Sequence, residues 1–92
     1  YKIIWEVYDN EEMQMLSTFS REKFIEYIPD DDRHRYDDTI EDGINPQSKK
    51  NALTQYLNKM KDWGFIGNKG RDKWFFIKSA MRELEHMKVG AE

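Results

Sequence analysis

The chain has 92 residues, enough for one domain, with 36% charged and 38% hydrophobic residues. It contains no cysteine, which excludes disulfide bonds, thiolate nucleophiles and cysteine-based zinc sites. The formal net charge of −3 hides a division of charge. Residues 1–46 carry 5 Lys/Arg and 13 Asp/Glu (net −8), whereas residues 47–92 carry 10 and 5 (net +5). A basic region of this kind attracts a polyanion whatever the charge of the whole chain.

The composition also restricts the cellular context. No apolar run approaches the ~20 residues of a membrane span, so we expect no membrane partner. The lack of cysteine and of a signal-peptide pattern favours an intracellular protein, cytoplasmic, nucleoid-associated or nuclear. Because the chain begins with Tyr1 and not with Met, we expect residues 1–92 to be a single domain of a longer protein.

The first third of the chain predicts a strand followed by a helix. Residues 1–9 alternate in side-chain type and are rich in β-formers, which predicts an N-terminal strand. The next segment has four apolar residues without a clear period, Met13, Met15, Leu16 and Phe19, and fits either a second short strand or a connector packed on the core. Ser20 is a suitable N-cap and Pro29 a stop signal, so a helix is predicted over residues 21–28.

Residues 30–42 hold seven acidic residues and fit a short acidic helix or a solvated loop equally well. Asn45 and Pro46 then suit the N-cap and first position of the clearest helix, residues 47–63, which Gly64 ends. Its apolar stripe consists of Ala52, Leu53, Tyr56, Leu57, Met60 and Trp63.

The last third of the chain predicts a hairpin and a helix. Short strands at residues 65–66 and 73–78 flank a loop at residues 67–72. A final helix is predicted over residues 80–87, with Ser79 as its N-cap.

The polar face of the 47–63 helix is unusual. Asn51, Thr54, Gln55 and Asn58 follow one another at i, i+3, i+4 and i+7, opposite the apolar stripe. Amide and hydroxyl groups hydrogen-bond to base edges in a major groove. The surrounding lysines would reach phosphates: Lys49, Lys50, Lys59 and Lys61. The alternative is an ordinary solvated face with incidental lysines. The absence of any acid from residue 43 to residue 61 favours the first interpretation.

The predicted hairpin adds Lys69, Arg71 and Lys73, and Gly67 and Gly70 would let its loop approach another surface. An arginine there would suit a narrow minor groove. A plain polar hairpin tip is the alternative.

This order of elements resembles a winged helix-turn-helix domain. The carrying segments are ALTQYLNKMKDWGFI (residues 52–66) and GRDKWFFI (residues 70–77), which are similar to a recognition helix, a glycine, an aliphatic strand and a wing. The resemblance covers residues 20–78. It implies DNA contact by the helix and by the wing. The sequence departs from the pattern where a middle helix is usual, because that position holds the acidic stretch, and in its extra N-terminal strand.

We therefore expect an α+β winged helix-turn-helix fold of three or four short helices with a small antiparallel sheet, made of the hairpin wing and the N-terminal strand. Residues 1–19 would form that strand and a connector, residues 20–78 the core, and residues 79–92 a C-terminal helix. If the protein binds DNA, the acidic stretch should point away from the DNA.

The expected function is recognition of double-stranded DNA by a specificity domain of a transcription regulator, a replication initiator or a restriction-type nuclease. The alternative is a winged-helix protein-interaction module without nucleic-acid contact. A third possibility is a non-catalytic part of an enzyme that positions its substrate. Partners besides DNA would be another domain of the parent protein or a second copy in a homodimer.

Sequence patterns for catalysis are missing. His34 and His86 are far apart, and no phosphate-binding glycine loop is present. An EF-hand alignment on Gly43 would place Ile40 where an oxygen ligand is required. We therefore expect no catalytic residues, no metal site and no cofactor.

Overall fold

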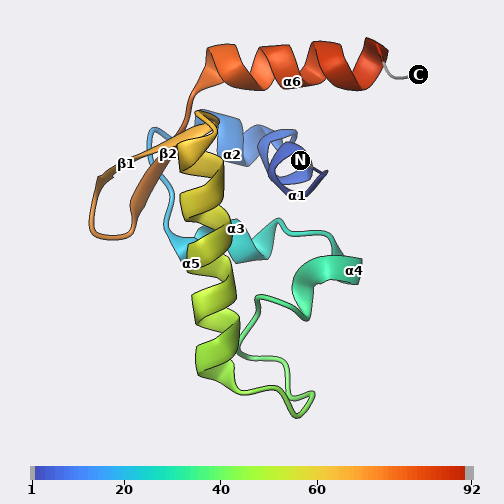
Figure 1. Cartoon of the computed structure of the whole chain (residues 1–92), viewed down its shortest axis with the longest axis vertical. Coiled ribbons are helices and arrows are strands. Elements are labelled where there is room, and N and C mark those ends of the chain that lie inside the picture. The colour runs from blue at the N-terminus through green and yellow to red at the C-terminus, as the bar shows by residue number, and fades with distance from the viewer. Residues whose placement is uncertain (1, 91–92) are drawn as a thin grey trace.

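The computed structural model describes residues 2–90, and the side chains of residues 3–86 within them. This part of the chain forms six helices and a two-stranded antiparallel sheet, an α+β architecture (Figure 1). In chain order the elements are α1 (Lys2–Tyr8), α2 (Glu11–Met15), α3 (Arg21–Glu26), α4 (Asp30–Arg33), α5 (Pro46–Asp62), β1 (Ile66–Gly70), β2 (Lys73–Phe76) and α6 (Lys78–Gly90). Helix α5 runs along the long axis, the hairpin lies beside its C-terminal half, and α6 lies across that end (Figure 1).

The core is built on one side of α5. Leu53, Leu57 and Met60 are buried there, as the predicted apolar stripe requires, while Ala52 and Tyr56 are partly buried. They pack in one cluster with residues of every other helix except α4 and with both strands: Ile4, Val7, Met13, Phe19, Phe24, Ile28, Ile66, Trp74, Met81 and Leu84. Trp63 departs from the prediction, since it lies at the C-cap of α5 and is 48% exposed.

The ends of the helices follow the predicted signals closely. The Asn45 side chain accepts a hydrogen bond from the Gln47 N–H (2.8 Å), and Pro46 is the first residue of α5. Gly64 ends the helix with a φ of +86°, a left-handed conformation that glycine adopts without strain. The Ser20 hydroxyl caps α3 by accepting from the Lys23 N–H (3.2 Å). Ser79 is not an N-cap, because α6 already begins at Lys78.

The N-terminal segment is a helix, and the predicted strand over residues 1–9 is wrong for residues 2–8; Tyr1 lies outside the described residues. Ile4 and Val7, three residues apart, are both fully buried, which requires the helical period. The Tyr56 hydroxyl accepts a hydrogen bond from the Ile4 N–H (2.9 Å), one of the donors that the first turn of a helix leaves free. The connector then forms α2, which Asn10 caps through the Glu12 N–H.

The hairpin pairs Ile66 with Phe76 and Asn68 with Trp74. Its strands extend to Gly70 and resume at Lys73, so the turn is shorter than the predicted loop and contains Asp72 with a φ of 58°. Phe19 adds an antiparallel bridge to Trp74 on the outer edge of β2, with N···O distances of 2.8 and 3.0 Å. The third position in the sheet therefore comes from residue 19 and not from residues 1–9.

The acidic stretch combines the two forms that the sequence left open. Asp30–Arg33 forms one helical turn, and residues 37–45 form an irregular loop, here called the acidic loop, that leads into α5. The loop projects at the end of the molecule opposite α6 (Figure 1).

The hydrogen bond between Tyr56 and α1 predicts the effect of one substitution. Tyr56→Phe should lower the free energy of unfolding by about 1–2 kcal/mol, because it leaves the partly buried Ile4 N–H without its acceptor. Tyr27→Phe is the matched control, since the Tyr27 hydroxyl donates to Glu12 at an exposed position and should matter less. Urea unfolding of the two variants measures the difference, and equal losses would contradict the assigned role of Tyr56.

Candidate nucleic-acid interface

The polar face of α5 is exposed over most of its length. Asn51, Gln55 and Asn58 are all exposed, on the side opposite Leu53 and Leu57. The Gln47 side-chain amide donates to Asn51 Oδ1 (3.1 Å), which orders the first turns of the row. Thr54 is partly buried and its hydroxyl accepts a hydrogen bond from Arg21, so it forms the edge of the face.

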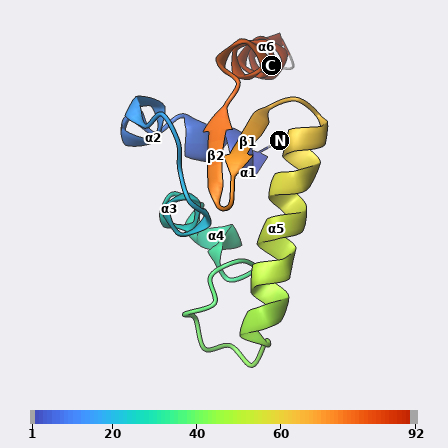
Figure 2. The same cartoon turned by 90° about the vertical axis from the view of Figure 1, so that its left-hand side faces the viewer.

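Arg21 joins three elements at this edge. Its backbone N–H and its Nε both donate to Asp72 Oδ1 (3.0 and 3.1 Å), and its Nη1 donates to Thr54 Oγ1 (2.9 Å). The start of α3, the hairpin turn and the middle of α5 are therefore linked, and the turn lies beside α3 (Figure 2). The Arg21 and Asp72 side chains are 44% and 37% exposed, so solvent screens their attraction and its main effect is on geometry.

Sequence reasoning missed Arg21. The available signal was its partner, because Asp72 is the single acidic residue between positions 63 and 82 of a basic segment. A lone acid in the turn of a basic hairpin indicates a fixed cation nearby, but the sequence does not say which one.

The hairpin presents the three predicted cations. Lys69, Arg71 and Lys73 are exposed, and none of them forms an ion pair within the described residues. The Lys69 ammonium lies 5.4 Å from the centre of the Phe75 ring. That ring covers Gly67, and a Cβ atom there would overlap it, so any other residue at position 67 would force the Phe75 ring to shift. Gly70, with a φ of +155°, lies before the turn in open space.

The four predicted lysines of α5 have different positions. Lys59 and Lys61 are exposed near its C-terminal end, and the Lys59 ammonium lies 5.3 Å from the centre of the Trp63 ring. Lys50 is more than half exposed, and its ammonium is 3.5 Å from an Asp38 carboxylate oxygen.

Lys49 corrects the prediction of a phosphate contact, because its side chain is only 1% exposed. Its Nζ donates to the backbone carbonyls of Asp37 (3.2 Å) and Ile40 (3.1 Å) and pairs with the Asp42 carboxylate (3.0 Å). A buried ammonium is stable only when its donors are satisfied in this way. Lys49 therefore anchors the acidic loop and is not available to a nucleic acid.

The acidic loop borders the polar face and does not point wholly away from it. Asp38 and Lys50 line a hollow of about 300 Å³ together with Arg21 and Asp72. Cations and carboxylates are mixed there, so the N-terminal half of α5 has no basic edge on this side. Among the described residues, the exposed cations without a carboxylate partner on this side gather around the C-terminal half of the helix and the hairpin, with Asp62 as an exposed acid among them.

Comparison with known proteins adds no family to these observations. No protein-family model matches the chain, and no significant match was found among curated proteins or solved structures. Within residues 2–90, no cluster of three or more His, Cys, Asp or Glu side chains is arranged to hold a metal ion. None of the helices in that range has the length and apolar character of a membrane span.

The acidic loop should respond to acid. The ammonium of Lys49 and the Ile44 N–H hold the pKa of Asp42 below its usual value of 3.8, and hydrogen bonds from Thr39 lower that of Asp37. A carboxylate with a lowered pKa stabilises the folded state above its usual pKa, and this contribution is lost as the pH falls through the folded-state value. Asp42→Asn should therefore lower the melting temperature at pH 7, and its difference from the wild type should shrink below about pH 4.

Glu41→Gln is the control for this measurement, because the exposed Glu41 side chain has no partner within the described residues. Its melting temperature should follow that of the wild type across the pH range. A difference for Asp42→Asn that stays constant down to pH 3 would show that the ion pair with Lys49 is not its cause.

Proposed function

We propose that this domain binds double-stranded DNA in the manner of a winged helix-turn-helix, with α5 in a major groove and the β1–β2 hairpin as the wing. Helices α3 and α5 would be the helix pair, separated by the acidic insertion. The observation that carries the proposal is the polar face of α5, with its exposed amides beside a hairpin that holds three unpaired cations. Asn and Thr are poorer helix formers than Lys, Arg or Glu, so helix stability alone does not explain Asn51, Thr54 and Asn58 on an exposed face.

The roles follow from the positions on the helix. Asn58 is the last residue of the row, towards the C-terminal cations of α5, and Gln55 lies three residues before it. Both reach outward without an intramolecular partner within the described residues, so both are free to contact base edges. Asn51 is a weaker candidate because its carbonyl oxygen is already bonded to Gln47. Thr54 would act with Arg21 in fixing the distance between the helix and the wing.

Phosphate contacts would come from the exposed cations at the C-terminal half of the surface. Five of them are not paired with a carboxylate within residues 3–86: Lys59, Lys61, Lys69, Arg71 and Lys73. Lys50 would contribute less, since Asp38 already partly neutralises it. The proposed surface is therefore narrower than the full set of basic residues in this half of the chain.

The salt dependence of binding to a labelled random duplex tests the proposal. Five phosphate contacts predict a slope of log K against log salt of about −4 to −5. Arg71→Gln and Lys73→Gln should each weaken binding and reduce the steepness of the slope by about 1. Asp62→Asn should strengthen binding, because it removes an exposed acid one turn after Asn58.

Lys78→Gln is the matched control, because Lys78 lies outside α5 and the hairpin and should not change the affinity. Once a preferred site is selected, Asn58→Ala should cost about 1–3 kcal/mol on that site and little on random duplex. Fluorescence anisotropy measures all of these affinities. If no duplex binds even at low salt, the proposed function is wrong.

A further inference from the structure

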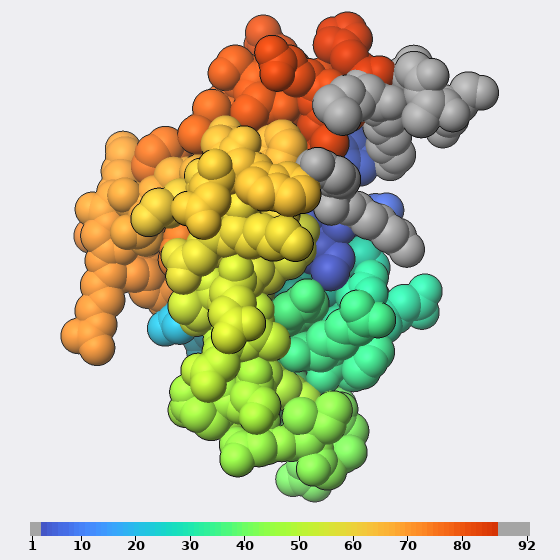
Figure 3. Space-filling model, in the orientation of Figure 1, coloured from blue at the N-terminus to red at the C-terminus, as the bar shows by residue number. Residues whose placement is uncertain are grey.

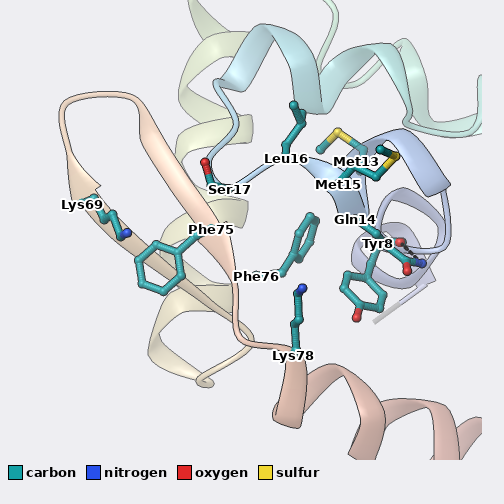
Figure 4. A pocket seen from close by; sticks show the side chains of 10 residues that line it. All are labelled: Tyr8, Met13, Gln14, Met15, Leu16, Ser17, Lys69, Phe75, Phe76 and Lys78. Carbon is teal, nitrogen blue, oxygen red and sulfur yellow. Dashed lines mark hydrogen bonds between the residues drawn. The ribbon is translucent and has the colours of Figure 1, made fainter.

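A second surface lies on the other side of the hairpin. A hollow of about 340 Å³ opens between the end of α2 and strand β2 (Figure 4). Helix α5 lies behind the hairpin in this figure. Met15 and Leu16 form one wall, and Phe75 and Phe76 form the other. Met15 is 85% exposed and Leu16 41% exposed, which is costly for large apolar side chains in water. A methionine wall also adapts to the shape of whatever binds to it.

The hollow is basic as well as apolar. Lys69 and Lys78 line it, and an adjoining hollow that shares Met15 and Lys78 adds Arg82. Glu11 is the acidic residue on this rim. Lys78 and Arg82 have no carboxylate partner among residues 3–86, so this groove would attract a segment that combines an apolar side chain with carboxylates.

The same chain carries such a segment on its surface. Ile44 in the acidic loop is 49% exposed, and the neighbouring Glu41 is exposed and has no ion-pair partner within the described residues. The three contacts of Lys49 hold the loop in place, so little ordering would be needed for it to bind. The loop projects at the end of the molecule opposite α6 (Figure 3), whereas Lys78 of the groove begins α6.

We propose that the acidic loop of one copy binds in the groove of a second copy. Ile44 would pack against Met15 and Leu16, and Glu41 would face Lys78 and Arg82. The two surfaces differ and lie at opposite ends of the molecule. The contact is therefore heterologous, and copies join head to tail in an open chain instead of a closed dimer. Lys69 lines both the groove and the DNA surface. Ile44, Met15 and Lys78 lie outside the DNA surface, so self-association can be tested without DNA.

The size of the contact sets its strength. A single loop in a groove buries less than the ~1,200 Å² of a stable interface, so association should be weak. Opposite charges on exposed side chains make it sensitive to salt.

Sedimentation velocity of the wild-type chain tests for this association. At concentrations up to about 1 mM the weight-average sedimentation coefficient should rise steadily, without stopping at a dimer. The rise should be smaller at about 500 mM than at about 50 mM salt. A chain that stays monomeric at low salt, or that stops at a dimer, would overturn the proposal.

Two variants with one defective surface each make the test specific. Met15→Glu places an acid in the groove, and Ile44→Ser removes the apolar side chain of the loop. Each variant alone should no longer form head-to-tail assemblies. An equimolar mixture of the two should form a 1:1 dimer that grows no further, because one intact groove meets one intact loop. Met15→Leu and Ile44→Val are the conservative controls and should associate as the wild type does.

Misfolding would not produce this pattern, since two damaged folds do not restore one another in a mixture. Met15 and Ile44 are both exposed, so neither variant disturbs the core. Circular dichroism confirms that each variant remains folded. A mixture that stays monomeric while the wild type associates would assign the self-association to another surface and would reject the proposed contact.

Discussion

The structure depends on the two-sided character of α5. One side of this helix carries its contacts with the core, and the edge of the opposite side is held only by the Thr54 bond to Arg21 and the pair of Lys50 with Asp38 within the described residues. Leu53, Leu57 and Met60 enter the core, and each contributes about 1.5–3 kcal/mol by burial. Tyr56 on the same side accepts the hydrogen bond from α1, and Lys49 holds the acidic loop. Because these contacts do not involve the opposite side, the row of amides there remains open to solvent and available to a ligand.

The angular position of each lysine on this helix decides whether its side chain is buried or exposed. At about 100° per residue, Lys49 lies at an angle between those of Tyr56 and Met60, inside the buried stripe, whereas Lys59 and Lys61 lie outside it. Its burial could therefore have been read from the sequence, and grouping it with the phosphate contacts ignored the helical period. Its partners could not be read in the same way. The path of the irregular acidic loop decides which carbonyls and which carboxylate surround the Lys49 ammonium.

Local signals predicted the hairpin, the α5 helix and its caps, because the residues that determine them are close together in the chain. The errors occur where contacts over long distances decide the structure. The N-terminal apolar residues fit a strand and a helix almost equally, and the hydrogen bond to Tyr56, 52 positions away, favours the helix. The contact of Arg21 with Asp72 spans 51 positions and determines how the hairpin is placed beside α5. A pattern within either segment carries no information about the other.

The separation of charge along the chain has a physical reason in the same helix. The dipole of α5 favours negative charge at its N-terminus, where the acidic loop packs, and positive charge at its C-terminus, where Lys59 and Lys61 lie. Each arrangement stabilises the helix in the free protein. At physiological salt, charges further apart than about 8 Å are largely screened from one another. The acidic half therefore does not cancel the basic surface at the other end of α5, and a negative net charge is compatible with attraction of DNA at that end.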